Sequence, residues 1–155
     1  MTRRVTHLPR RAVALVLCTL LAAPGVALAA KRYRVSASGT VKFVKREAKT
    51  KIVEQRGTVK GQPFGTGTLT LRTKLAARKK LEYSIRFASK AGDVWGNGTA
   101  ALEVSGSSAT YKGTLKIQGG DGRYKGIGAS TLTVSGSGPA NVKTTNVRIS
   151  GTVSY

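Results

Sequence analysis

Eight segments of this chain alternate between apolar and polar residues, and this period of two constrains the fold more than any other feature. Between Tyr33 and Phe43, every odd position is apolar or small and every even position is polar or charged. Successive side chains of a β-strand point to opposite faces of its sheet, so each such segment is predicted to be a strand with one buried face. The pattern recurs clearly in 65–72, 81–87, 94–104, 110–117 and 145–153, and more weakly near 50–60 and 129–136.

Turn residues separate these segments at hairpin spacing, as at 61–63 and 105–107. Eight antiparallel strands with one apolar face close most simply into a barrel, because closure removes the unpaired sheet edges. We therefore predict an all-β fold, an eight-stranded antiparallel closed barrel, with a two-sheet β-sandwich as the alternative. Glycines interrupt the apolar face, and they mark either sharp bends in the strands or space for a ligand.

The first 29 residues have the organisation of a secretory signal peptide. Four arginines precede an apolar run at 12–23, and the small residues at 27 and 29 supply a cleavage pattern. We expect cleavage before Ala30, which would leave a single domain, residues 30–155, in a secreted protein. An uncleaved membrane anchor is the alternative for this segment.

The predicted domain has a narrow chemical repertoire. The only cysteine, Cys18, and the only histidine, His7, both lie in the predicted signal peptide. The domain is therefore expected to have no disulfide, no thiol or imidazole catalysis, and no metal or cofactor. This excludes most familiar catalytic machinery and favours a protein that is not an enzyme.

Positive charge is strong and unevenly spread along the chain. The formal net charge is +21, and residues 31–90 hold 17 Lys and Arg against three Glu. Such a field favours anionic partners, such as acidic polymers of a cell surface, and a simply solvated surface is the alternative. Arg78, Lys79 and Lys80 form a basic turn and are the candidate contacts. Nucleic acid is not expected as a specific partner, because the protein is predicted to be exported and no basic and aromatic stacking platform is evident.

Between the sixth and seventh predicted strands lies a segment with five glycines, 119–128. Its residues follow the order Gly-Gly-x-Gly-x-aromatic-x-Gly after an apolar strand, and they are Gly119, Gly120, Gly122, Tyr124 and Gly126. The segment resembles the strand and glycine loop of the dirigent and allene oxide cyclase superfamily. The resemblance implies an eight-stranded barrel with an apolar lumen, often oligomeric in plant members, so a homo-oligomer is among the expectations. The activities of that family are cyclisation of an allene oxide and control of phenoxy-radical coupling, and their cavity residues have no matching positions here.

Two functional hypotheses follow. In the first, the lumen binds a small apolar ligand, or guides its reaction by confinement, with tyrosine hydroxyls orienting it. Its candidate lining is the set of aromatic residues on the predicted inward faces: Tyr33, Phe43, Tyr83, Phe87 and Tyr111. In the second, the protein is a non-enzymatic surface protein whose basic residues bind acidic cell-surface polymers.

Overall fold

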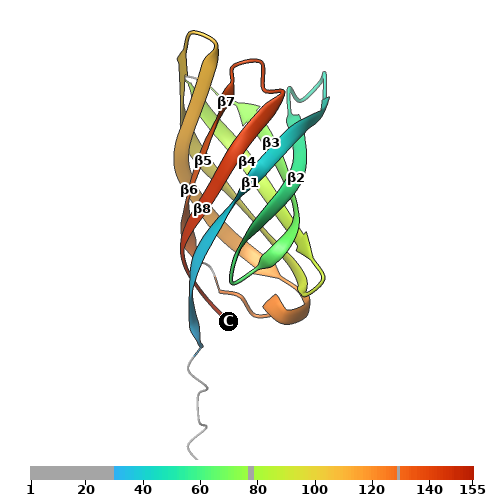
Figure 1. Ribbon diagram of the computed structural model, residues 1–155, viewed down its shortest axis with the longest axis vertical. Helices are drawn as coiled ribbons and strands as arrows, with labels where there is room; N and C mark the ends of the chain where they lie inside the picture. The colour runs from blue at the N-terminus through green and yellow to red at the C-terminus, as the bar shows by residue number, and fades with distance from the viewer. Residues whose placement is uncertain (1–29, 77–78, 129) are drawn as a thin grey trace, which may run out of the picture.

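A computed structural model describes residues 30–76, 79–128 and 130–155. Within them the chain forms one closed antiparallel barrel of eight strands, which confirms the predicted barrel over the sandwich (Figure 1). One short 3₁₀ turn, η1 (Gly122–Tyr124), accompanies the strands. The strands are β1 (Arg32–Arg46), β2 (Val53–Gln62), β3 (Gly65–Leu75), β4 (Lys80–Ser89), β5 (Gly92–Ser105), β6 (Ser108–Gly120), β7 (Thr131–Pro139) and β8 (Thr144–Ser154).

Closure joins the first strand to the last. β1 pairs with β8 from Arg32 opposite Ser154 to Lys42 opposite Thr144, and every other strand pairs with its neighbours in sequence. No strand is left as an edge, so the main-chain donors and acceptors of the strands find partners within the barrel.

The alternation of the sequence becomes the inside and outside of the barrel. In β4, for example, Leu81, Tyr83, Ile85 and Phe87 are buried, and the residues between them are exposed. The inward side chains of all eight strands form one continuous core. The outward face is built mainly from Thr, Ser, Lys and Arg.

The barrel has two distinct ends (Figure 1). The first strand begins at Arg32 and the last strand ends at Ser154, and both of these residues lie at what we call the lower end. The opposite end, which we call the upper end, is formed by the four connections 46–53, 75–80, 105–108 and 139–144.

Aromatic side chains close the lower end. Tyr124 is 1% exposed, and its ring packs edge-on against Phe64 at 5.3 Å and Tyr155 at 5.7 Å between ring centroids. Its hydroxyl donates a hydrogen bond to the Phe64 carbonyl oxygen at 3.3 Å. Tyr33 stacks on Tyr155 at 4.6 Å, which extends the aromatic cluster to β1.

The glycine segment makes this closure possible. It connects β6 to β7, and Gly122 and Gly126 adopt left-handed backbone, with φ of +54° and +84°, which glycine tolerates without strain. Asp121 fixes the turn, since its carboxylate accepts the Asp93 N–H at 2.6 Å and its own N–H donates to the Asp93 carbonyl at 2.9 Å. The segment thus folds back and inserts Tyr124 beneath the barrel.

Candidate functional site

The lumen is packed rather than hollow. The cavity enclosed by its inward side chains, among them Phe64, Phe87 and Leu115, has a volume of about 20 Å³. This is roughly the space of one water molecule. The described core therefore offers no room for a small apolar ligand.

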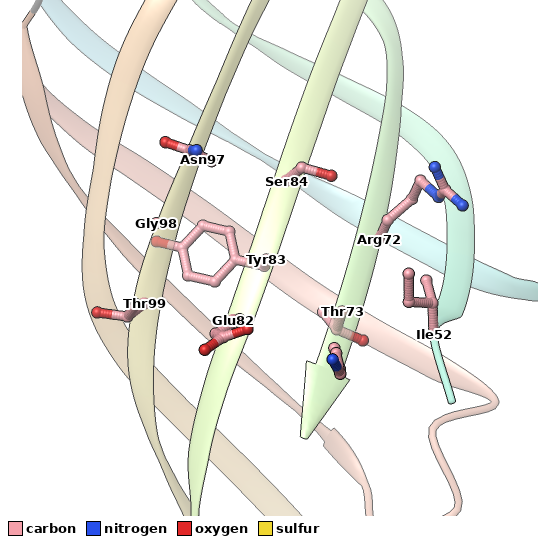
Figure 2. Close-up of a pocket in the computed structure, with 10 residues that line it drawn as sticks. Ile52, Arg72, Thr73, Glu82, Tyr83, Ser84, Asn97, Gly98 and Thr99 are labelled. Carbon is pink, nitrogen blue, oxygen red and sulfur yellow. The ribbon is translucent and has the colours of Figure 1, made fainter. Parts of the chain in front are cut away.

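Aromatic rings fill the space that the inward glycines leave. Tyr83 on β4 extends over its register partner Gly98 on β5, as Figure 2 shows. Its hydroxyl donates to the Thr114 carbonyl oxygen on β6 at 2.8 Å. Tyr111 covers its partner Gly136 on β7 in the same way.

Other inward glycines sit where a neighbouring strand approaches closely. A Cβ atom on Gly39, Gly57 or Gly113 would collide with the backbone of the adjacent strand. The glycines of the apolar face therefore either lie under an aromatic ring or allow a neighbouring strand to approach closely. They do not open space for a ligand.

The five aromatic residues predicted to line one ligand site do not all lie in the core. Tyr83, Phe87 and Tyr111 are buried in the core. Tyr33 is half-buried in the cluster at the lower end. The placement of Phe43 in the lumen was wrong: it is 45% exposed, because it follows the last β1–β8 pair at Lys42 and lies at the rim of the upper end.

A buried amide near the upper end escaped the sequence reasoning. Gln55 on β2 is 3% exposed, and its Nε2 donates to the Val142 carbonyl and to Thr145 Oγ1, both at 2.9 Å. It ties β2 to the β7–β8 connection although β1 lies between them. The sequence carried a signal, since Gln55 shares the inward phase of Val53 and Val59, where a polar residue needs buried partners.

A shallow groove of about 450 Å³ crosses the outer wall of β3, β4 and β5 (Figure 2). Its outward side chains include Glu82, Ser84, Asn97 and Thr99, together with Arg72. These groups are mixed in charge, and within the described residues no three or more His, Cys, Asp or Glu side chains gather as a metal site would require. The groove thus lacks a concentrated chemical function.

The upper end, in contrast to the groove, carries exposed side chains of mainly positive charge. Eight Lys and Arg side chains lie on or next to three of its four connections: Lys45, Arg46, Lys49, Lys51, Lys74, Lys79, Lys80 and Lys143. Of these, only Lys45 takes part in an ion pair among the described residues. Two of the three predicted polyanion contacts, Lys79 and Lys80, lie here, and the third, Arg78, is outside the described residues.

Two carboxylates near the upper end, Glu47 and Glu54, are engaged with neighbouring cations. Glu54 lies within 4 Å of Lys45, Arg56 and Arg72, and Glu47 pairs with Arg72 as well. Hydrogen bonds from Thr50 and Arg72 hold the pKa of Glu47 below its usual value. These acids therefore neutralise Arg72 and its neighbours and leave the lysines of the upper connections available.

Two of these lysines occupy backbone that an ordinary side chain avoids. Lys51 and Lys79 have φ of +56° and +59°, and Val142 has +54°. All three are in upper connections, and they are the only non-glycine residues of the described chain with positive φ. Left-handed backbone costs about 1–2 kcal/mol for a residue with a Cβ atom. Strain of this kind is concentrated at functional positions in proteins.

The fold and the upper end together define a packed, basic β-barrel whose distinctive chemistry lies outside its lumen. Comparisons with protein-family models, with curated proteins and with solved structures found no match to this chain. Among the described residues there is no helix long and apolar enough to cross a membrane. The predicted signal peptide, residues 1–29, lies outside the described residues.

Proposed function

We propose that this protein is a non-enzymatic binding protein that attaches to anionic surfaces or polymers through its upper end. The observation that carries the proposal is the set of exposed lysines there, two of them held in left-handed backbone where glycine would be the easier residue. A positively charged surface attracts polyanions and speeds their encounter with the protein.

The packing of the lumen supports this reading over confinement of a ligand. A cavity of about 20 Å³ cannot enclose an organic molecule of several rings, since ligand pockets hold about 300–1,000 Å³. The binding of a small apolar ligand stays a prediction with no cavity in the described core to support it. We therefore assign the function to the exterior of the barrel, where the basic connections of the upper end are the most distinctive feature.

The upper end can be tested against a charge-matched control in the same molecule. Lys49, Lys80 and Lys143 lie on three different upper connections, whereas Lys60, Lys90 and Lys125 are also exposed but lie toward the lower end. None of the six belongs to an ion pair among the described residues. Replacing either trio by serine removes the same charge.

Binding to dextran sulfate, a soluble acidic polymer, gives the readout. Each lysine near an anionic surface contributes about 1 kcal/mol, so the upper trio is expected to weaken binding about 100-fold and the lower trio far less. Binding of the unmodified protein should be lost near 1 M salt, where the screening length falls to about 3 Å. Equal losses in both trios, or binding that is indifferent to salt, would overturn the proposal.

A further inference from the structure

The upper end also gathers exposed apolar side chains. Five large apolar residues of the described chain are substantially exposed, and four of them lie at this end. They are 45–60% exposed, and we call them the apolar lip: Phe43, Val44, Leu75 and Val104. The fifth, Trp95, lies on the outer wall near the other end of β5, with its ring over Gly119.

The lip arises because three strands extend their inward face past the core. Val41 is fully buried in β1, and Phe43 is the next residue of the same face. Leu75 is the last residue of β3, and Val104 is the last but one of β5. Val44 lies at the bulge between Phe43 and Lys45. The lip therefore consists of core-type side chains presented at the mouth of the barrel.

Cations adjoin three residues of the lip in the chain, whereas Glu103 precedes the fourth, Val104. Lys45 follows Val44 in the chain, Lys74 precedes Leu75, and Lys80 begins the strand that pairs with β3. Long lysine side chains can lay their methylene stems along apolar surface and extend their charge beyond it. Apolar residues among lysines are the composition of surfaces that bind at the interface of anionic membranes.

From this juxtaposition we propose that the partner of the upper end is an anionic phospholipid bilayer, with the apolar lip inserted among the lipids and the lysines at the headgroups. The inference rests on the proposed function and specifies its partner. A hydrated acidic polymer would satisfy the lysines alone and would leave the lip exposed to water. A bilayer satisfies both, since burial of the lip adds to the attraction of about 1 kcal/mol for each lysine.

The first test compares vesicles with a soluble polymer. The variant Phe43→Ser/Leu75→Ser/Val104→Ser removes three exposed apolar groups and no charge. It should bind vesicles of phosphatidylglycerol and phosphatidylcholine about tenfold or more weakly than the unmodified protein, while its affinity for dextran sulfate is unchanged. Vesicles of phosphatidylcholine alone should bind neither protein.

The second test reports insertion directly. Trp95 is the only tryptophan of the chain and lies far along the wall from the lip. Brominated lipids in the anionic vesicles should leave its fluorescence unchanged, whereas the tryptophan of a W95F/F43W protein should be quenched on binding. Trp95→Phe alone, whose vesicle affinity should equal that of the unmodified protein, controls for loss of the native ring.

The outcomes separate this inference from the function on which it rests. Vesicle binding that the triple serine variant retains in full, with no quenching at position 43, overturns the membrane partner but leaves polyanion binding intact. If the unmodified protein binds neither anionic vesicles nor dextran sulfate, the proposed function itself is wrong. A lip that is buried in a homodimer, shown by a mass that halves in the serine variant, would also contradict the inference.

Discussion

The ring of Tyr111 on β6 covers Gly136, its register partner on β7, so that a methyl group at position 136 would collide with the ring. Tyr83 on β4 covers Gly98 on β5 in the same manner, in the adjoining pair of strands. In each pair the tyrosine ring fills the space beside the glycine, so the inner face of the barrel is packed at both positions. The cavity enclosed by the inward side chains is accordingly about 20 Å³.

Gly136→Ala should destabilise the barrel strongly. The added methyl group overlaps Tyr111, and overpacking of this kind costs about 2–3 kcal/mol. Gly128→Ala is the control, because the nearest atoms around its Cβ position are at ordinary contact distance, 3.7 Å, and its cost should stay within about 0.5 kcal/mol. Urea denaturation of the two variants provides the comparison, and equal costs would contradict the ring-over-glycine packing.

The two buried tyrosines should respond differently to loss of the hydroxyl. Tyr83 donates to the Thr114 carbonyl at 2.8 Å, whereas the hydroxyl of Tyr111 is buried without a hydrogen-bond partner in the described structure. Tyr83→Phe should therefore cost about 1 kcal/mol, and Tyr111→Phe should be neutral or stabilising by about the same amount. A larger loss for Tyr111→Phe than for Tyr83→Phe in chemical denaturation would count against this assignment.

Stability should fall at alkaline pH through these tyrosines. Burial raises the pKa of Tyr83 and of Tyr111 well above the usual value, so the folded protein keeps protons that the unfolded chain releases above about pH 10. The contribution is complete below about pH 10 and is lost as the pH rises beyond it. Chemical denaturation below and above about pH 10 should show a smaller loss of stability in the Tyr111→Phe variant than in the unmodified protein. An equal loss in the two proteins would contradict the prediction.

Lys51→Gly and Lys79→Gly should each make the fold more stable and weaken binding to anionic surfaces. Each relieves left-handed strain, offset in part by the greater flexibility of glycine, for a net gain of about 0.5–1 kcal/mol. Each also removes one cation from the upper end and should weaken binding to anionic vesicles by about fivefold. Val142→Gly relieves the same kind of strain without loss of charge, so its affinity should equal that of the unmodified protein. If the two lysine variants gain stability and keep full affinity, the strained backbone at these positions has no role in binding.

The alternating pattern was sufficient to predict the barrel because alternation is a local property. In β4 the inward set of Leu81, Tyr83, Ile85 and Phe87 can be read directly from the sequence. What alternation cannot supply is where each strand leaves the core. Phe43 continues the inward face of β1, yet it passes the last β8 partner and is exposed, and that depends on the lengths of both strands.

The candidate site was less accessible to sequence reasoning for the same physical reason. Lys79 and Lys80 could be identified as a basic turn, but their association with Lys49 and Lys143 requires the closed topology that brings four connections to one end. Gln55 was overlooked because its partners, Val142 and Thr145, are distant in sequence. The likeness of the glycine segment to the dirigent and allene oxide cyclase superfamily stays a prediction.

Residue-resolved mapping of the contact tests the central claim most directly. Addition of dextran sulfate to ¹⁵N-labelled protein should shift the amide resonances of the upper connections, 46–53, 75–80 and 139–144, and leave those of 62–65 and 89–92 at the lower end unchanged. Shifts concentrated at the lower end, or spread evenly over the wall, would contradict binding through the upper end.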